Sequence, residues 1–252
     1  MNKLYFVSDA HFLNLPDKNN YSEKKFEELI NEIIKQKGEL IVIGDIFDFW
    51  IEYKYFMPKY YFNVLHSLKK AAENGVKIHI ICGNHDYWHL DFFKRFVNAE
   101  IFRNEMTISN EENLFYITHG DGVLKSDRGY RIIKPLMRNR ILIKLLKCIH
   151  PDITMKAVNH ISNYPRNNYK NHILTHEMKA ELIEWAKEIA KEGYKYIVIG
   201  HYHTPFIKEI EKDKFLICIG DWLKHFTFGY YDDKNFSLCY WDKKNHNFSL
   251  TK

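Results

Sequence analysis

The sequence contains few cysteines and no long apolar run. Its four cysteines are scattered and form no C-x-x-C pair, which argues against a zinc ribbon and against a disulfide scaffold. No stretch of about 18 apolar residues is present, so no membrane-spanning helix is predicted. The apolar stretch near the N-terminus is short and ends at Asp9, which argues against a secretory signal. We therefore expect a cytoplasmic protein that begins at Met1.

Internal repeats and low-complexity linkers are also missing from the sequence, which favours one folding unit. A hydrophobic content of 46% and an aromatic content of 16% are ample for a sizeable core in a chain of 252 residues. Short apolar runs alternate with amphipathic stretches such as 22–37 and 175–192, and this alternation predicts strands that alternate with helices. We expect an α/β fold with a single domain over residues 1–252.

Positive charge is concentrated in one segment. The net charge is +5, but residues 131–170 hold nine lysines or arginines and one acid, Asp152, which leaves 28 basic and 31 acidic residues elsewhere. Aliphatic residues run through the same segment. One interpretation is a helical lid, over about 122–172, that lies against anionic lipid or holds an acyl chain. The other is a helical hairpin that packs its apolar face on the core and leaves its cations in solvent.

Polar side chains follow five separate apolar runs at the point where each run ends. In open α/β sheets, ligands gather beyond the carboxyl ends of the strands, so we expect these side chains to meet at one edge. In chain order they are Asp9, His11, Asp45, Asn84, His85, Asp86, His119, His201 and His203.

The residue types in this set predict a metal centre. Without His85 and Asp86, the set offers two carboxylates, one amide oxygen and four imidazoles, which suit Mn²⁺, Zn²⁺ or Fe²⁺ better than Ca²⁺. Seven ligands are too many for one such ion, so we expect two divalent ions about 3.5–4 Å apart. Asp45 is the expected shared ligand, because it stands alone at the end of a central strand. Mn²⁺ is the expected metal, with Zn²⁺ and Fe²⁺ as alternatives.

Each of these residues alone also has a structural explanation. Asp9 could cap a turn, and Asp45 and Asp48 could cap the helix that follows them. The joint pattern favours the ligand interpretation. For Asp48 and Asp86 two roles stay open, because either could orient a histidine ligand or merely end a helix.

The series D-x-H, G-D-x-x-D, G-N-H-D, H-G-D and G-H-x-H, from Asp9 to His203, resembles the calcineurin-like metallophosphoesterases. The resemblance implies a four-layer α/β/β/α sandwich, here with a helical lid inserted at about 122–172. It also implies a metal-dependent hydrolase of phosphoric esters or anhydrides. By the same resemblance, one ion is bound by Asp9, His11, Asp45 and His203, and the other by Asp45, Asn84, His119 and His201.

Such a centre is suited to in-line attack of an activated water on phosphorus. Asn84, His85 and Asp86 are the expected catalytic residues. His85 would lie beside the leaving oxygen and donate a proton to it, with Asp86 behind the imidazole. A phosphodiesterase acting on nucleotides or nucleic acid is the alternative function, although the basic segment is mostly aliphatic and so poorly suited to stacking on bases. A non-catalytic scaffold is a further alternative.

Longer stretches, "GDIFDFW", "HGDGVLKSDRGYR" and "GDWL", resemble the UDP-2,3-diacylglucosamine diphosphatases, a lipid A pathway branch of this superfamily. The resemblance implies hydrolysis of a lipid-linked nucleotide sugar to UMP and 2,3-diacylglucosamine 1-phosphate (lipid X), with no nucleic-acid partner. It implies peripheral binding, through the basic lid, to the cytoplasmic face of the inner membrane. The best-known branch carries arginine at the position of His85. The expected substrate contacts are Asp127, Asn84, His85, Ser162 and Arg166.

Overall fold

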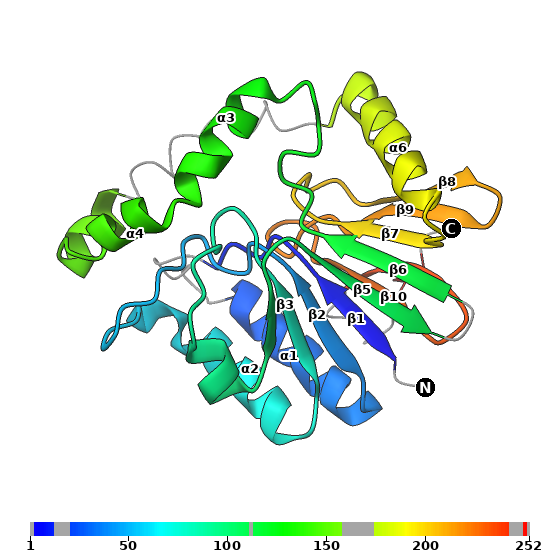
Figure 1. Ribbon diagram of the computed structural model, residues 1–252. Helices are drawn as coiled ribbons and strands as arrows, with labels where there is room; N and C mark the ends of the chain where they lie inside the picture. The colour runs from blue at the N-terminus through cyan, green and yellow to red at the C-terminus, as the bar shows by residue number, and fades with distance from the viewer. Residues whose placement is uncertain (1–2, 13–20, 111–112, 158–173, 242–248, 251–252) are drawn as a thin grey trace.

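Two β-sheets packed face to face form the centre of the computed structural model, which describes residues 3–12, 21–110, 113–157, 174–241 and 249–250 (Figure 1). The larger sheet has the strand order β12-β11-β10-β1-β2-β3-β4. Its strands are β1 (Leu4–Val7), β2 (Glu39–Ile43), β3 (Ile78–Ile81), β4 (Glu100–Phe102), β10 (Thr227–Tyr231), β11 (Phe236–Tyr240) and β12 (Ser249–Leu250).

The smaller sheet has the strand order β5-β6-β7-β9-β8. In both sheets the central strands are parallel, β1 to β4 in one and β6, β7 and β9 in the other. The strands of the smaller sheet are β5 (Glu105–Asn110), β6 (Asn113–Thr118), β7 (Tyr196–Ile199), β8 (Phe206–Glu211) and β9 (Lys214–Cys218).

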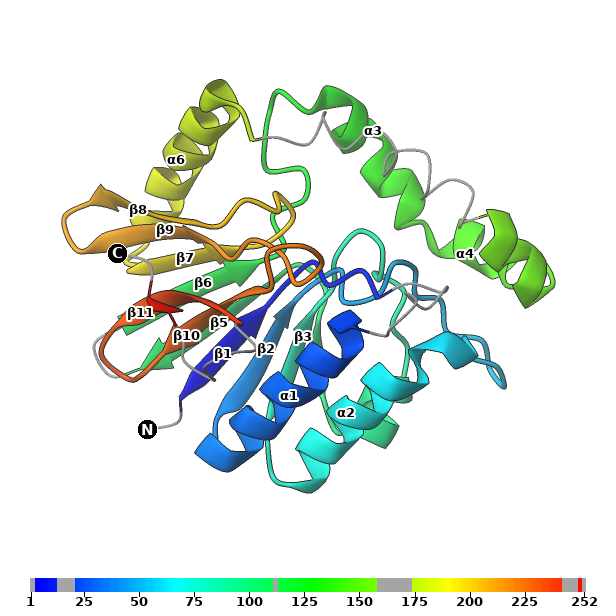
Figure 2. The same ribbon diagram turned by 180° about the vertical axis from the view of Figure 1, so that it is seen from behind.

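Helices cover the outer face of each sheet. Helices α1 (Tyr21–Gln36) and α2 (Phe62–Glu73) lie on the larger sheet (Figure 2), and α6 (His176–Ala190) lies on the smaller one. Two short helical segments, η1 (Lys59–Tyr61) and η2 (Phe93–Val97), flank α2 in the chain. The layers are therefore α/β/β/α, and the predicted four-layer sandwich is confirmed.

Side-chain alternation along the strands explains why both faces of the sheets are buried. In β1, Tyr5 and Val7 belong to the core beneath α1 and α2, whereas Leu4 and Phe6 belong to the core between the sheets. Strands covered on both faces need apolar residues at every position. This requirement accounts for the continuous apolar runs from which the strands were predicted.

The short strands β4 and β8 were not predicted. Strand β8 is the edge of the smaller sheet, and its sequence "FIKEIE" carries charges because most of its residues are half-buried or exposed. The expectation of one sheet edge also needs correction. The polar residues that follow the apolar runs come from two sheets, whose parallel strands end at the same place.

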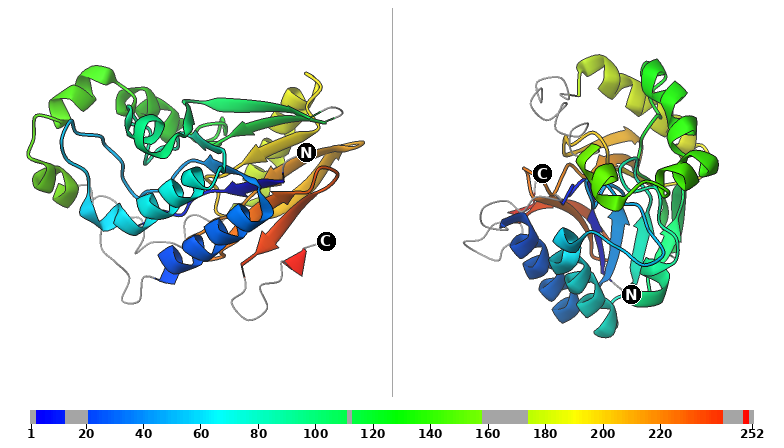
Figure 3. Two further views of the ribbon diagram at one scale, coloured as in Figure 1. Left: turned by 90° about the horizontal axis from the view of Figure 1, so that it is seen from below. Right: turned by 90° about the vertical axis from the view of Figure 1, so that its left-hand side faces the viewer.

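The segment after β6 forms helices α3 (Arg128–Met137) and α4 (Arg140–Leu146), and residues 151–157 are also helical. We call residues 122–157 the insert; residues 158–172 of the expected lid lie outside the described residues. Figures 1 and 3 show that α3 and α4 project beyond the two-sheet body. No helix of the described residues is long and apolar enough to cross a membrane.

The hairpin alternative, with an apolar face packed on the core, is wrong for α3 and α4. Helix α3 has no buried residue, and in α4 only Ile143 is buried. Aliphatic side chains of these helices, such as Ile132, Leu136 and Ile141, are instead exposed.

We predict that Ile117→Ala, in the core between the sheets, lowers the free energy of unfolding by about 2–5 kcal/mol. Ile117 is fully buried, so the substitution leaves a cavity. The matched control is Ile207→Ala on the exposed edge strand β8, for which we expect a change within about 0.5 kcal/mol. Urea unfolding measures both values, and equal losses would contradict the assigned core.

Candidate metal centre

The carboxyl ends of five parallel strands meet beneath α3 (Figure 1). Strands β1, β2 and β3 come from the larger sheet, and β6 and β7 come from the smaller one. The seven expected ligands follow these strands: Asp9 and His11 after β1, Asp45 after β2, Asn84 after β3, His119 after β6, and His201 and His203 after β7. The structure thus assembles the predicted set at the junction of two sheets.

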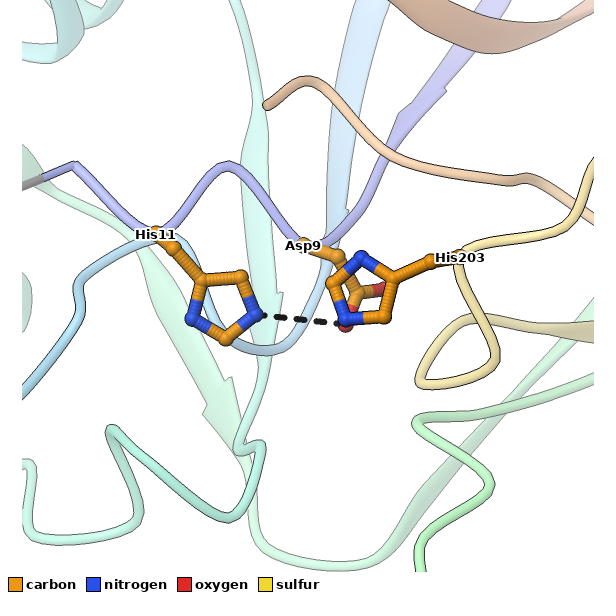
Figure 4. A group of neighbouring side chains, drawn as sticks. All are labelled: Asp9, His11 and His203. Atoms are coloured by element: carbon orange, nitrogen blue, oxygen red, sulfur yellow. Dashed lines mark ion pairs between the residues drawn. The ribbon is translucent and has the colours of Figure 1, made fainter. Parts of the chain in front are cut away.

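Asp9, His11 and His203 form one group, whose possible ligand atoms all lie within 4.8 Å of one another (Figure 4). Oδ1 of Asp9 is 3.7 Å from Nε2 of His11 and 3.7 Å from Nε2 of His203. The second carboxylate oxygen, Oδ2, accepts a hydrogen bond from the backbone N–H of His201 at 2.8 Å. One oxygen of Asp9 is therefore held by the protein, and the other faces two imidazoles.

Asp45, His119 and His201 form a second group of the same kind. Nε2 of His119 is 3.3 Å from Oδ2 of Asp45 and 3.1 Å from Oδ1 of Asn84. The same Oδ2 of Asp45 lies 3.8 Å from Nε2 of His11 in the first group. Asp45 thus faces both groups, and each group falls within one of the two ligand sets that the family resemblance implies. His11 also belongs to a third group, with Asp48 and His85.

The spacing and burial of these atoms fit divalent cations. Ligand atoms bound about 2.1 Å from one ion lie about 3–3.6 Å apart, close to the separations seen here. Within the described residues, Oδ1 of Asp9 is buried and has no hydrogen-bond partner. A buried carboxylate oxygen without a partner is costly, and a cation between it and the facing imidazoles would remove that cost.

The pKa shifts reflect the same need for positive charge. Burial favours the neutral form of Asp45, but the charge of His119 prevails and holds the pKa of this carboxyl well below its usual value. Burial alone would lower the pKa of His119. The negative charge of Asp45 outweighs this effect and raises the pKa of His119 to about 10. Burial lowers the pKa of His201 to about 4, which keeps its imidazole neutral. A metal ion would replace the proton that His119 carries.

Most of the candidate ligands lie in strained backbone. A non-glycine residue in the left-handed region costs about 1–3 kcal/mol when the surrounding structure holds it there, and such residues cluster at functional sites. Neighbouring loops hold each other in this conformation, since the N–H of His11 donates to the carbonyl oxygen of Asp45 at 2.9 Å. The φ angles are 50° for Asp9, 43° for His11, 53° for Asp45, 66° for His201 and 52° for His203.

Two glycines of the motifs allow the strand ends to approach closely. A Cβ atom at Gly83 would lie 2.0 Å from Oδ1 of Asp45, and one at Gly200 would lie 1.9 Å from Oγ of Ser8. No side chain fits at these separations. The glycines of "GNHD" and "GHYH" are therefore required by the packing around the two aspartates.

Asp86 does not lie behind His85 as expected. Its fully buried carboxylate accepts hydrogen bonds from the backbone N–H groups of Gly83 at 2.9 Å, Asp45 at 3.1 Å and Ile46 at 2.9 Å. Burial raises the pKa of Asp86 to about 6. Asp86 thus fixes the loop that carries Asp45 and does not contact the imidazole of His85 directly.

Asp48 is the residue that faces the imidazole of His85. Nδ1 of His85 lies 2.8 Å from the carbonyl oxygen of Asp48 and 3.9 Å from its carboxylate. Because a carbonyl oxygen can only accept, Nδ1 carries the proton in this contact. The carboxylate of Asp48 also lies 3.9 Å from Nδ1 of His11, so it faces two histidines of the site.

Asp221 is a site residue that was missed in the sequence. Its Oδ2 lies 3.6 Å from Nδ1 of His203, on the opposite side of the ring from Asp9. A carboxylate in this position fixes the orientation and tautomer of a histidine ligand. The sequence did contain a pattern that points to Asp221. "FLICIGD" is a sixth apolar run that ends in a polar residue, and it has the same G-D ending as "IVIGD".

The expected substrate contacts lie in different places. Asp127 caps α3, where its Oδ1 accepts from the backbone N–H of Tyr130 at 3.2 Å. Ser162 and Arg166 lie outside the described residues. Asn84 and His85 line a cavity of about 130 Å³ between the metal centre and the insert. Its other lining residues are Phe49, Tyr87, Trp88, Tyr130, Lys134, Met137, Arg138, Leu142, Ile143 and Leu146.

Comparison with known proteins finds relatives that match most of the chain. A UDP-2,3-diacylglucosamine hydrolase of Porphyromonas gingivalis is 26% identical over 246 residues, which cover 91% of this chain and 94% of that protein. A UDP-2,3-diacylglucosamine hydrolase of Vibrio vulnificus is 26% identical over 220 residues and covers 86% and 88% of the two chains.

Solved structures align with most of this chain at low sequence identity. GAP50, described as the anchor in the inner membrane complex of Plasmodium, aligns with a TM-score of 0.52 at 11% identity, over 100% of this chain and 90% of that one. The phosphoesterase YfcE of E. coli aligns with a TM-score of 0.47 at 15% identity, over 98% and 96% of the two chains.

The family model for the calcineurin-like phosphoesterases matches residues 3–205, which include all seven candidate ligands. This span contains strands β1 to β7, which come from both sheets, together with the insert. Together with the hydrolase relatives, it identifies the chain as a metal-dependent hydrolase of phosphoric esters or anhydrides. The chain belongs to the calcineurin-like phosphoesterase family.

Proposed function

We propose that this chain hydrolyses the diphosphate of UDP-2,3-diacylglucosamine and releases UMP and 2,3-diacylglucosamine 1-phosphate, a step of lipid A biosynthesis. The cavity between the metal centre and the insert is the observation that carries this proposal. Its lining combines the polar side chains of Asn84 and His85 with the aliphatic side chains of Leu142, Ile143 and Leu146 of α4. An amphiphilic phosphoanhydride matches both kinds of lining.

The relatives support the same substrate. Those described above are named for it and match this chain over most of their length. The basic, aliphatic character of the insert also suits an anionic lipid better than a nucleic acid, because stacking on bases needs aromatic side chains.

The metal ligands in this proposal are the six residues of the two groups together with Asn84. Asp9, His11, Asp45 and His203 would bind one divalent ion, and Asp45, Asn84, His119 and His201 would bind the other. Mn²⁺ is the proposed metal, with Zn²⁺ and Fe²⁺ as alternatives. When bound, such ions lower the pKa of a coordinated water and neutralise charge on the phosphate oxygens.

The chain's own residues would then act on the leaving group and on the geometry of the site. The carbonyl oxygen of Asp48 orients the imidazole of His85, which leaves Nε2 for the substrate. A protonated His85 would donate from Nε2 to the departing phosphate oxygen. Asp86 acts indirectly, by holding the loop of Asp45, and the amide of Asn84 would contact the phosphate as well as the metal.

Contacts to the sugar are proposed for Asp127, Ser162 and Arg166. Asp127 lies at the N-terminus of α3, next to Tyr130, which lines the cavity. Its capping bond uses Oδ1, and a carboxylate can accept several hydrogen bonds, so Oδ2 would contact the glucosamine hydroxyls.

We further propose that the protein binds peripherally to an anionic membrane, the cytoplasmic face of the inner membrane. Besides the exposed aliphatic residues of the insert, the loop before α2 exposes Tyr55, Phe56 and Met57. Figures 1 and 3 place this loop and α4 at the same end of the molecule, and Oη of Tyr53 donates to Oγ1 of Thr154 at 3.3 Å. Residues 53–72 contain four lysines and no acid, which adds attraction to anionic lipid.

We predict that Asp45→Ala abolishes both activity and metal binding in a protein that remains folded. The loss should exceed the roughly 10²–10³-fold typical of removing one group that stabilises a transition state, because the shared ligand is lost. Metal content by elemental analysis and phosphodiester turnover measure the effect. Asp213→Ala is the matched control, since Asp213 has a similar φ of 59° but lies outside the site. Substantial activity in Asp45→Ala would refute the ligand assignment.

A second prediction concerns the substrate. With Mn²⁺, hydrolysis of UDP-2,3-diacylglucosamine, measured as UMP release, should be fast. Hydrolysis of a cyclic nucleotide or of single-stranded DNA, measured as release of the corresponding mononucleotides, should be slow. Leu146→Asn, in the cavity wall, should lower kcat/KM for the diacylated substrate by about 10–100-fold, since burying an amide without a partner costs about 1–3 kcal/mol. With the substrate in detergent micelles, where membrane docking does not contribute, Leu145→Asn is the control, because Leu145 is 61% exposed on the same helix and does not line the cavity. Faster turnover of DNA than of the lipid would favour the nucleic-acid alternative.

A third prediction concerns the membrane. The full-length protein should co-float with vesicles of phosphatidylcholine that contain an anionic phospholipid, and less with phosphatidylcholine alone. Ile141→Ser and Phe56→Ser should each weaken binding by about tenfold, because burying one such side chain contributes about 1.5–3 kcal/mol. Ile207→Ser on β8, at the opposite end of the molecule, should have no effect (Figure 1). Equal binding by all three variants would contradict this docking face.

A further inference from the structure

Helix α3 turns a polar stripe toward the two-sheet body. Tyr130 and Lys134 of α3 and Arg138 directly after it are spaced four residues apart, so they lie on one side of the helix. All three contact the same carboxylate, that of Asp121 in the "HGD" motif. Oη of Tyr130 and Nη2 of Arg138 donate to Oδ2 of Asp121 at 2.7 and 3.0 Å, and Nζ of Lys134 lies 3.0 Å from the same oxygen. Nζ of Lys134 also donates to the carbonyl oxygen of Asp121 at 2.6 Å.

These contacts outweigh apolar packing as the attachment of α3. Asp121 is only 5% exposed, whereas no residue of α3 is buried. Other contacts of the helix end are also polar: Arg138 donates to Oδ1 of Asn104 at 3.1 Å and lies over the ring of Tyr87. Hydrogen bonds to a charged, buried group are stronger than those between neutral groups at the surface. Asp121 is therefore the centre of the contact between the insert and the body.

The charges at this contact do not balance. Within the described residues, Asp121 is the only carboxylate within ion-pair distance of Lys134 or Arg138. Two cations that face one carboxylate give this contact a net charge of +1. Both cations line the same cavity as Asn84 and His85, so this excess charge adjoins the place of the proposed diphosphate.

We propose that Asp121 is a positioning residue, which docks α3 over the metal centre and holds Lys134 and Arg138 toward the substrate's phosphates. Asp121 touches neither substrate nor metal in this arrangement and acts through the helix. The docking of α3 by Asp121 is inferred only from the contacts described above and does not depend on the proposed function. Its effect on substrate selection rests on the proposed function, because only a substrate that reaches from the metal centre into the cavity would depend on the position of α3.

The docking is tested by hydrogen–deuterium exchange of the α3 amides in the full-length, metal-loaded protein. Asp121→Asn and Arg138→Met should each speed exchange across residues 129–137 by about tenfold, since each removes a charged contact. The double variant should exchange little faster than the quicker single variant, because both changes break the same contact. Arg131→Met is the matched control: Arg131 is an exposed cation of the same helix, and its exchange should stay within about twofold of the unchanged protein.

Equal exchange in Arg138→Met and Arg131→Met would overturn the proposal. If Asp121→Asn fails to fold, Lys134→Met and Arg138→Met break the same contact from the side of the insert and keep the test intact. Exchange that rises over the whole protein and not in α3 alone would also contradict a specific docking role.

Kinetics separate positioning from general destabilisation. Asp121→Asn should raise KM for the diacylated nucleotide sugar by about tenfold with a smaller change in kcat, whereas a partly unfolded enzyme loses kcat at unchanged KM. If the protein hydrolyses no diacylated nucleotide sugar but α3 still opens in Asp121→Asn, the proposed function fails and the docking stands. If it hydrolyses that substrate and α3 exchange is unaffected in every variant, the docking fails and the function stands.

Discussion

Two buried carboxylates at the junction of the sheets impose the main constraint on this molecule. Asp9 is fully buried and Asp45 is 1% exposed, and a charge removed from water in this way must be compensated nearby. The chain meets that requirement with histidines supplied by strands of both sheets. Because no single strand can surround a carboxylate, the two sheets must end at the same place. The four-layer arrangement is thus the scaffold that brings the two ends together.

The same constraint explains the unfavourable backbone at the site. Loops that turn their side chains onto Asp9 and Asp45 adopt left-handed conformations, and Gly83 and Gly200 allow the approach. The strain is opposed by three hydrophobic cores, one beneath α1 and α2, one between the sheets and one beneath α6. It is opposed locally by Asp86, whose three backbone hydrogen bonds hold the loop of Asp45. Rigid layers therefore carry a centre that would not be stable as an isolated loop cluster.

The difference between the buried layers and the loops and edges around them determines what could be predicted from the sequence. Parallel strands buried on both faces give apolar runs, so their ends, and the seven candidate ligands, were found. Strand β8 could not be predicted in this way, because an exposed edge strand has no apolar run. The contact of Asp86 could not be found either, since its partners are backbone N–H groups, which every residue carries. For α3 the sequence shows an amphipathic helix without showing which face turns inward, because the partner that decides it, Asp121, precedes the helix inside a metal motif.

The inward face of α3 separates the chemistry of this protein from its selectivity. The metal centre acts on phosphorus and is indifferent to the rest of the substrate, so the same arrangement serves a whole family. Had α3 packed its aliphatic side on the body, the cavity would be apolar and closed to anions. With Lys134 and Arg138 lining the cavity and Ile132 and Leu136 exposed, cations adjoin the place of the proposed diphosphate, and an apolar surface is left for the proposed lipid contact. Reversing one helix would thus remove both features that favour an amphiphilic substrate, while leaving every candidate metal ligand in place.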